Sequence, residues 1–351
     1  MNKTMRAAVF HGMNDLRIEE VPIPGISPDE ILIKVLNANI CGTDLRILYK
    51  GHRLYPEGTV RIPGHEVAGE IAKVGENVSK YKVGDRVFIA PNMGDGDSRE
   101  TISGNNNLDP NFQAVGINID GAFAEFMLVP AQAIRQGNVM LLSEDADPAT
   151  AAMIEPLACV LRGQNAVNLK TGDIVVVMGA GPMGILHMLL AKTRGAAKVV
   201  ISEPIENRRK QALELGADFV VDPINEDLGE MVRGISDGRG ADVIIVAAPS
   251  KPAQQSALQI AAIGGRINLF GGLPKNDPTI QFDSNIVHYK ELVVTGTTAC
   301  STYDCLQAAD LVNAGLIKLD NLVTSRFPLK DAVSAFEAAA DGTNLRVSLV
   351  P

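Results

Sequence analysis

The 351-residue chain has few of the side chains that bind soft metals. Its four cysteines, Cys41, Cys159, Cys300 and Cys305, are too few and too scattered for a disulfide scaffold. Because only five histidines accompany them, a Cys/His-rich zinc module is excluded, although a single metal site is not.

Long apolar runs and basic clusters are also missing. No run approaches the ~18 residues of a membrane span, and the start, Met1 to Arg6, is too polar and short to open a signal peptide. We therefore expect a cytoplasmic protein. With a net charge of -9 and no Lys/Arg cluster, neither nucleic acid nor an anionic membrane is an expected partner.

The length predicts two domains, on a soft prior of about 150 residues each. Residues 5–150 are rich in short strands separated by turns, which favours a barrel-like domain. The expected strands there are 6–10, 16–18, 30–35, 67–74 and 85–88.

The pattern changes near Leu169, where apolar strands begin to alternate with helical segments. Six such strands with helices between most of them predict a doubly wound parallel sheet. The expected strands are 173–178, 198–203, 219–221, 242–246, 266–270 and 291–295, and the expected helices are 182–194, 207–215, 227–235 and 252–263. Residues 302–343 are expected to be helical, and 346–350 to form a closing strand.

A glycine motif lies between the first of these strands and the helix that follows it. Gly179-x-Gly181-x-x-Gly184 has the strand–turn–helix context of a dinucleotide site. Its glycines permit a tight turn, close approach of a pyrophosphate and close helix packing, and the helix N-terminus faces the anion. Pro182 and Met183 complete the loop, and Pro182 suits a first helical turn.

Glu203 ends the second strand, 24 residues after Gly179. A carboxylate at this place binds the ribose hydroxyls of NAD and repels the 2′-phosphate of NADP. Arg208 is included among the expected cofactor residues, and Arg208 and Arg209 weaken the preference for NAD modestly. A plain tight turn at the glycines and a solvated strand end at Glu203 are the alternatives.

Three further segments carry a resemblance to a known family: Cys41-Gly42-Thr43-Asp44, the stretch from Gly64 to Val78, and Glu155-Pro156-Leu157-Ala158. The second is similar, position by position, to the pattern G-H-E-x2-G-x5-G-x2-V. Over essentially its whole length the chain resembles the zinc-dependent medium-chain dehydrogenase/reductase family, and most of all its polyol (sorbitol-type) and threonine dehydrogenase branches.

The resemblance implies a GroES-like catalytic domain, residues 1–152 and 298–351, and a Rossmann domain, residues 153–297. It implies that Cys41 and His65 bind a catalytic zinc, with Glu66 as third ligand and Glu155 as a fourth, directly or through water. Such a set leaves a position open for substrate, whose hydroxyl pKa a zinc ion lowers. Thr43 is the implied first proton acceptor, or else a loop cap.

The chain departs from the family pattern at Arg46. Many relatives carry there a histidine that relays protons, which an always-charged arginine does not do. The proton then leaves through water, the cofactor ribose, Glu66 or Glu155. Arg46 is otherwise a contact for the pyrophosphate or for an anionic substrate group, or part of a solvated loop with Lys50, His52 and Arg53.

A second departure concerns the lobe after Gly84-Asp85-Arg86-Val87. Relatives with a structural zinc carry four cysteines there, spaced C-x2-C-x2-C-x7-C. This chain has Asp95, Ser98, Thr101 and Asp109 at those spacings. Because these hard oxygen ligands match tetrahedral zinc poorly, we expect no structural zinc; calcium or magnesium is the alternative.

The sequence thus predicts an enzyme that transfers a hydride from a secondary alcohol of a polyol, free or phosphorylated, to NAD, with one catalytic zinc. L-threonine 3-dehydrogenase activity and a redox-silent nucleotide-binding protein are the alternatives. A homodimer or homotetramer is expected from the family.

Overall fold

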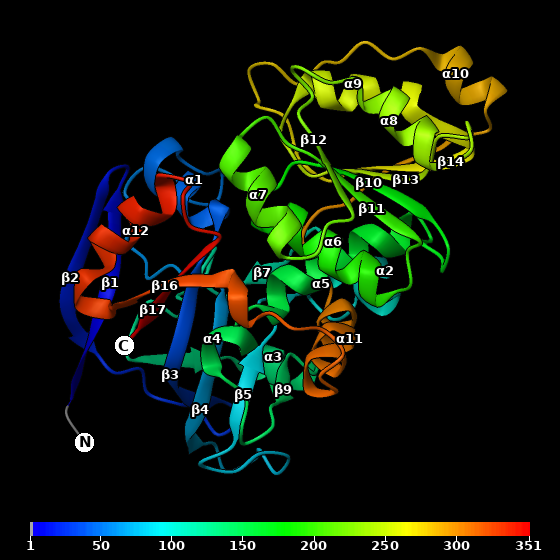
Figure 1. The fold of residues 1–351 in the computed structure, drawn as a ribbon. Helices are drawn as coiled ribbons and strands as arrows, with labels where there is room; N and C mark the ends of the chain where they lie inside the picture. Colours follow the sequence, from blue (N-terminus) through cyan, green and yellow to red (C-terminus); the bar gives the residue numbers. More distant parts are fainter. Residues whose placement is uncertain (1–2) are drawn as a thin grey trace. The chain divides into compact units, whose positions relative to one another are not determined.

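The computed structural model describes residues 3–351, which divide into two compact units (Figure 1). Unit 1 holds the chain up to Ala158 together with Cys300–Pro351, and unit 2 holds Cys159–Ala299. The domain boundaries expected after residues 152 and 297 stay a prediction. None of the helices within 3–351 is long and apolar enough to cross a membrane.

Unit 1 is built on a seven-stranded sheet in the order β16-β17-β3-β4-β5-β9, with β8 also paired to β3. A hairpin of β1 and β2 and a short pair of β6 and β7 complete its strands. The bounds are β1 Thr4–Gly12, β2 Asp15–Pro22, β3 Ile31–Ile40, β4 Glu66–Val74, β5 Arg86–Ile89, β6 Asn92–Met93, β7 Gln113–Ala114, β8 Phe126–Val129, β9 Val139–Leu141, β16 Val323–Pro328 and β17 Arg346–Val350.

The helices of unit 1 are short, and α5 continues from unit 1 into unit 2. They are α1 Gly42–Lys50, α2 Arg99–Ile102, α3 Ala131–Arg135, α4 Pro148–Ala151, α5 Ile154–Ala166, α11 Thr302–Asn313 and α12 Ala332–Ala340, with 3₁₀ turns at Asn106–Leu108, Asp320–Leu322 and Leu329–Asp331. The expectation that 302–343 is wholly helical is wrong, because β16 lies between α11 and α12. Within residues 3–351 this strand pairs with β17 alone, and it alternates half-buried and exposed residues, so it lacks a continuous apolar run.

The order of strands in unit 1 brings three distant segments to one edge of the sheet. Because β3 and β4 are antiparallel, with Asn39 opposite Glu66, the end of β3 lies beside the start of β4. Strand β17 is antiparallel to β3 on its other side, with Val347 opposite Ile40. The residues that precede β4, follow β3 and open β17 therefore gather in one place.

Unit 2 is the predicted doubly wound sheet. Its six strands are parallel throughout, in the order β12-β11-β10-β13-β14-β15, which is the order of a dinucleotide-binding fold. Helices α8 and α9 lie on one side of the sheet and α6 on the other (Figure 1). The bounds are β10 Ile174–Met178, β11 Lys198–Ser202, β12 Phe219–Val221, β13 Ala241–Val246, β14 Ala261–Leu269, β15 Val293–Gly296, α6 Pro182–Thr193, α7 Glu206–Glu214, α8 Leu228–Ile235, α9 Lys251–Ile260 and α10 Ser284–Tyr289.

The predicted elements of unit 2 have boundaries within two residues of the observed ones, except at the junction of α9 and β14. The helix expected to reach Ile263 ends at Ile260, and β14 begins at once with Ala261. A bulge follows, because Ala241 pairs with Ala261 while Val243 pairs with Arg266. The apolar residues before Gly264 and Gly265 fit either a helix end or a strand start, so periodicity alone does not separate the two.

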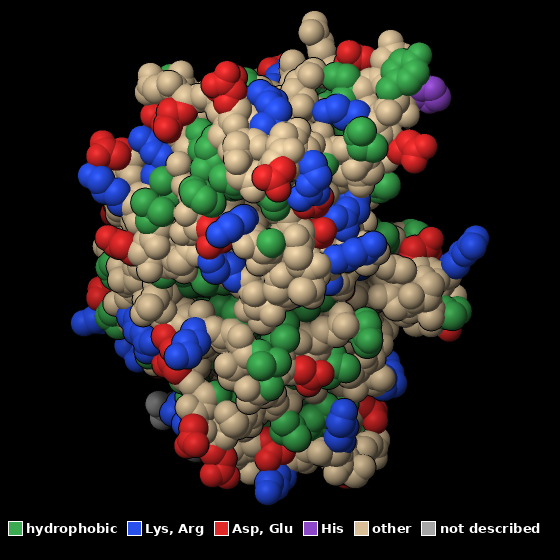
Figure 2. All heavy atoms as spheres, turned by 45° about the vertical axis from the view of Figure 1, so that its right-hand side comes forward, with side chains coloured by type: hydrophobic (Ala, Val, Ile, Leu, Met, Phe, Trp, Pro, Cys, Tyr) green, Lys and Arg blue, Asp and Glu red, His purple; other side chains and the backbone are tan. Residues whose placement is uncertain are grey.

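Charged side chains of both signs are interspersed over the face of the molecule drawn in Figure 2. This face presents no continuous basic stripe of the kind that tracks a nucleic acid backbone.

Candidate metal and dinucleotide sites

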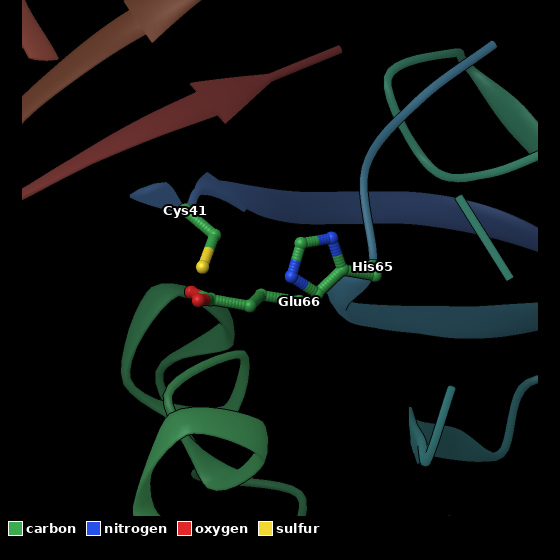
Figure 3. A group of neighbouring side chains, drawn as sticks. All are labelled: Cys41, His65 and Glu66. Carbon is green, nitrogen blue, oxygen red and sulfur yellow. The ribbon is translucent and has the colours of Figure 1, made fainter. Parts of the chain in front are cut away.

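The chain brings Cys41, His65 and Glu66 together at the edge of the unit 1 sheet (Figure 3). One ligand atom of each lies within 4.8 Å of those of the other two. Cys41 follows β3 and precedes α1, while His65 and Glu66 open β4, so the antiparallel pairing of these strands sets the distance. We call these three residues the ligand set.

His65 and Glu66 are buried and Cys41 is half-buried, and the polar atoms of the set are poorly satisfied. His65 is 5% exposed and Glu66 is 0% exposed. Neither carboxylate oxygen of Glu66 accepts a hydrogen bond from any residue in 3–351, and Nδ1 of His65 has no hydrogen-bond partner there either. Buried polar groups are almost always hydrogen-bonded, so such a cluster indicates a ligand.

Two charged residues that the sequence did not single out contact this set. Asp44 Oδ1 lies 3.4 Å from His65 Nδ1, and Asp44 Oδ2 accepts a hydrogen bond of 2.8 Å from the Cys41 backbone. Arg346 Nη1 lies 3.2 Å from Glu66 Oε1 and from the carbonyl oxygen of Ile40. The sequence could have indicated Asp44, because it belongs to the Cys-Gly-Thr-Asp segment. It could not have indicated Arg346, which reaches the site through the pairing of β17 with β3.

The electrostatics of the set reflect the crowding of charge. Burial opposes ionisation of Cys41, but the neighbouring His65 and Arg346 outweigh it and hold the pKa of the thiol below its ordinary value. Burial would lower the pKa of His65, yet Asp44 and Cys41 raise it well above normal. The pKa of Glu66 is raised well above its usual range, first by burial and then by Cys41 and Glu155, against the effect of Arg346.

These residues fit a zinc ion. A thiol sulfur, an imidazole nitrogen and a carboxylate oxygen are all zinc ligands, and three protein ligands are what catalytic zinc sites use. The unsatisfied oxygens of Glu66 are the atoms that a cation would stabilise. Asp44 beside the imidazole matches the carboxylate–histidine arrangement common around metal-binding histidines.

Glu155 lies on α5 and is 6% exposed, but it is not part of the ligand set within the described chain. Its Oε1 accepts a contact of 3.7 Å from the Cys300 thiol, whose sulfur is 3.5 Å from that of Cys305. Its charge still raises the pKa of Glu66. Glu155 is therefore close enough to influence the ligand set, and its role as fourth ligand stays a prediction.

Thr43 and Arg46 both lie on α1, directly after Cys41. Thr43 is half-buried, whereas Arg46 and Lys50 are exposed to solvent. The exposed guanidinium of Arg46 is available to an anionic group, as the sequence allowed, and the proton-accepting role of Thr43 stays a prediction.

The four lobe residues Asp95, Ser98, Thr101 and Asp109 converge, and we call them the Asp109 cluster. Oδ2 of Asp109 accepts hydrogen bonds from Ser98 Oγ at 2.5 Å, Thr101 Oγ1 at 2.6 Å and the Asp95 backbone N–H at 3.0 Å. Oδ1 accepts one from the backbone N–H of Asn111 at 2.7 Å. Burial raises the pKa of Asp109, but these hydrogen bonds outweigh it and hold that pKa well below its usual range.

The glycines of the dinucleotide motif have three different surroundings in unit 2. Gly179 has a φ of 110°, a conformation that favours glycine. A Cβ on Gly184 would lie 1.9 Å from the Gly179 carbonyl oxygen, whereas one on Gly181 would meet nothing within 4 Å. The loop is thus tight where it packs on itself and open where a pyrophosphate would approach.

A cavity of about 1090 Å³ lies beside this loop within unit 2. Of the predicted cofactor residues, Gly179, Glu203 and Arg208 line it, whereas Gly181, Pro182, Met183 and Gly184 are not among its lining residues within the described chain. Binding of the cofactor by these residues stays a prediction. Both carboxylate oxygens of Glu203 are fixed, because the backbone N–H groups of Ala180 and Ile205 donate to them at 2.8 and 3.0 Å.

Sequence reasoning missed two apolar residues of this cavity, Ile205 and Ile224. They are 48% and 75% exposed, yet both line the cavity. Exposed isoleucines beside a pocket are suited to pack on a flat, apolar ring such as adenine. Neither position was recognisable from the strand pattern, because each lies in a turn after a strand.

Comparison with known proteins places both units. The model of the alcohol dehydrogenase GroES-like domain matches residues 27–139, and that of the zinc-binding dehydrogenase domain matches residues 182–314. L-threonine 3-dehydrogenase of Thermococcus kodakarensis is 34% identical over 342 residues, covering 95% of this chain and 93% of that protein. Sorbitol dehydrogenase of Bacillus subtilis is 31% identical over 355 residues, covering 99% and 98%.

A solved structure agrees with these matches. A zinc-binding dehydrogenase from Sinorhizobium meliloti 1021, bound to NADP, superposes with a TM-score of 0.91 at 30% identity and covers 100% of both chains. The chain therefore belongs to the zinc-dependent medium-chain dehydrogenase/reductase family. It is a dehydrogenase of the zinc-dependent alcohol oxidoreductase class, with a GroES-like and a Rossmann domain.

Proposed function

We propose that this enzyme oxidises a secondary alcohol of a polyol, with NAD as hydride acceptor and a single catalytic zinc. The observation that carries the proposal is the ligand set, in which a thiol, an imidazole and a carboxylate meet with unsatisfied buried atoms. A dehydrogenase of this class needs such a set to bind its metal.

Cys41, His65 and Glu66 would hold the zinc, with Glu155 as the further ligand. When bound, zinc supplies Lewis-acid chemistry, which lowers the pKa of an alcohol. Asp44 places its charge 3.4 Å from Nδ1 of His65, and Arg346 offsets the negative charge of Glu66. Both act on ligand geometry and basicity, which contribute to metal affinity.

Proton transfer is assigned first to the hydroxyl of Thr43. Thr43 follows Cys41 by two residues and is half-buried, so its hydroxyl lies next to the ligand set along the chain. Arg46 does not relay the proton onward, because a guanidinium keeps its proton at every working pH. The proton then passes to water, the cofactor ribose, Glu66 or Glu155.

The exposed Arg46 favours a substrate with an anionic group. Lys50 and Arg53 are exposed close to it along the chain, and His52 is half-buried. A phosphorylated polyol would use this charge, whereas an unphosphorylated one would not. Equal kcat/KM on the free and phosphorylated polyol would contradict a phosphate-binding role.

L-threonine is a second candidate substrate. The relative from Thermococcus kodakarensis, at 34% identity over 95% of the chain, bears the name L-threonine 3-dehydrogenase. The carboxylate of threonine is a further anion that Arg46 could bind. The two candidates share the secondary alcohol and differ in what surrounds it.

NAD is the proposed cofactor because of Glu203. Its carboxylate is held by two backbone N–H groups and lines the cavity beside the glycine loop. A carboxylate there repels the 2′-phosphate of NADP. The Sinorhizobium meliloti relative binds NADP, so direct comparison of the two cofactors is the deciding measurement.

The test is a screen for NADH and NADPH formation with the full chain, over polyols, polyol phosphates, diols and L-threonine, with and without added zinc. We expect zinc-dependent NADH formation on a polyol. Formation of NADH on threonine alone would favour the second candidate. Turnover that survives complete chelation would contradict the zinc mechanism.

Two further expectations need other experiments. Sedimentation would test the expected dimer or tetramer, and cell fractionation would test the expected cytoplasmic location.

A further inference from the structure

Arg209 on α7 contacts two separate loops of unit 2. Its Nη1 donates hydrogen bonds to the carbonyl oxygens of Glu203 and Pro204, at 2.7 and 2.8 Å. Its Nη2 lies 3.2 Å from Asp222 Oδ2, and both side chains of this ion pair are largely buried, at 16% and 14% exposed. The planar guanidinium thus joins the loop after β11 to the residue that follows β12.

Asp222 in turn organises its own loop. Its Oδ1 accepts a hydrogen bond of 3.0 Å from the backbone N–H of Ile224, and its Oδ2 accepts one of 3.0 Å from the Asn225 side chain. Its backbone N–H donates to Glu226 Oε2 at 2.7 Å. These contacts lower the pKa of Asp222, first through the Ile224 backbone and then through Asn225 and Arg209, so the carboxylate keeps its charge.

The two loops joined by Arg209 line the same cavity. One contributes Glu203 and Ile205, and the other contributes Ile224 and Asn225. Arg209 itself is not among the cavity-lining residues of the described chain, whereas its neighbour Arg208 is. The guanidinium of Arg209 is committed to two carbonyls and a carboxylate, which leaves it unsuited to bind a phosphate.

We propose that the ion pair of Arg209 and Asp222, which we call the brace, holds together the two loops that line this cavity. The brace then sets the selectivity for NAD over NADP by fixing the position of Glu203. This inference rests on the proposed use of a dinucleotide by unit 2. Arg209 and Asp222 are positioning residues, and Glu203 is the group that meets the ribose.

The test measures binding of NADH and NADPH to the full chain by fluorescence titration, without substrate. Arg209→Ala should raise the Kd for NADH about tenfold and change the Kd for NADPH much less, so that selectivity falls. Asp222→Asn should act in the same direction. Because the two side chains work as one unit, the double variant should be no worse than the poorer single variant.

A matched control is Lys210→Ala, on the same helix. Lys210 is exposed and forms an ion pair of 2.6 Å with Glu206, which is also exposed, so we expect both Kd values to stay within twofold of the wild type. Arg209→Lys should recover part of the selectivity, because an ammonium reaches the carboxylate but not both carbonyls. Circular dichroism would establish that each variant is folded.

Three results would overturn the brace. Arg209→Ala could weaken NADPH more than NADH, which would make Arg209 a phosphate ligand. It could behave like the Lys210 control, or its effect could add fully to that of Asp222→Asn. If the wild type binds neither cofactor, the proposed dinucleotide site falls too, whereas binding without alcohol oxidation would remove only the substrate part of the proposed function.

Discussion

Two clusters of polar side chains in unit 1 have opposite hydrogen-bond balances. The ligand set of Cys41, His65 and Glu66 contains a buried carboxylate that accepts no hydrogen bond within residues 3–351. The Asp109 cluster contains a buried carboxylate that accepts four, three of them on one oxygen.

The difference is the reason why we expect a metal at only one of the two. Glu66 has the Arg346 guanidinium at 3.2 Å but accepts no hydrogen bond within residues 3–351, so a metal cation would further stabilise its charge. The Asp109 carboxylate already accepts hydrogen bonds from hydroxyl and backbone N–H groups, and these stabilise its negative charge without a metal ion. We therefore expect the ligand set, and not the Asp109 cluster, to bind zinc.

The largest expected effect is at Cys41. In Cys41→Ala the sulfur ligand is lost, and we expect kcat/KM to fall about 1000-fold or more, since Lewis-acid catalysis is worth several kcal/mol. Zinc content should fall from about one per wild-type chain to well below one. Elemental analysis together with NADH formation checks this. Two zinc ions per wild-type chain would contradict a metal-free lobe.

The second effect is on stability rather than on activity per folded chain. Asp109→Ala leaves two hydroxyls and two backbone N–H groups without their acceptor, and we expect unfolding to become about 3 kcal/mol less costly. Zinc content should not change. Asp97→Ala, an exposed residue of the same lobe, is the control and should have almost no effect. A loss of bound zinc in the Asp109 variant would show that the lobe holds metal after all.

A smaller effect is expected at Asp44, which supports the ligand set without belonging to it. Asp44→Asn keeps an acceptor for the Cys41 backbone but removes the charge beside His65. We expect zinc affinity to fall about 10- to 100-fold, as for other carboxylates behind metal-binding histidines. Competition with a chelator measures it. Unchanged affinity would mean that Asp44 serves only to begin α1.

The smallest effect tests whether every unsatisfied buried group marks a ligand site. His187, in unit 2, packs edge-on against Phe270, with ring centroids 4.6 Å apart, and neither ring nitrogen has a hydrogen-bond partner in the described chain. Burial lowers the pKa of His187 to about 3, so the ring stays neutral when folded. No other potential metal ligand of residues 3–351 groups with it, unlike the ligand set.

The unfolded chain protonates His187 below a pH of about 6.5, and the folded chain does not. Stability that is present above this pH is therefore lost as the pH falls toward 3. Between pH 7 and 5.5 the wild type should lose about 1 kcal/mol more unfolding free energy than His187→Leu, as measured by urea titration. Equal losses in the two proteins would contradict the prediction, because they would mean that burial does not lower the pKa of His187 in the folded chain.

The sequence predicted the six parallel strands of unit 2 because each is an apolar run with a helix beside it. It also predicted Cys41, His65 and Glu66 as a group, although through resemblance to a family rather than through spacing. Arg346 and Asp222 were not predicted, because their roles depend on strand pairing and loop contacts that no local pattern encodes. Strand β16 was missed because its inward residues are only half-buried and include Ser325, so its sequence has no clear apolar alternation.

Unit 1 is built from two segments of the chain that are separated by unit 2, and this has a consequence for its folding during synthesis. Its sheet needs β17, and the ligand set needs Arg346, but the 141 residues of Cys159–Ala299 are synthesised in between. At ~5–20 residues per second, β3 and β4 emerge from the ribosome and wait roughly 15–55 seconds for β17, because all of the chain between Val74 and Arg346 is made first. During that interval Glu66 has no arginine beside it. Unit 2 can thus fold first, while the metal-binding unit is still an unfinished sheet with an open edge.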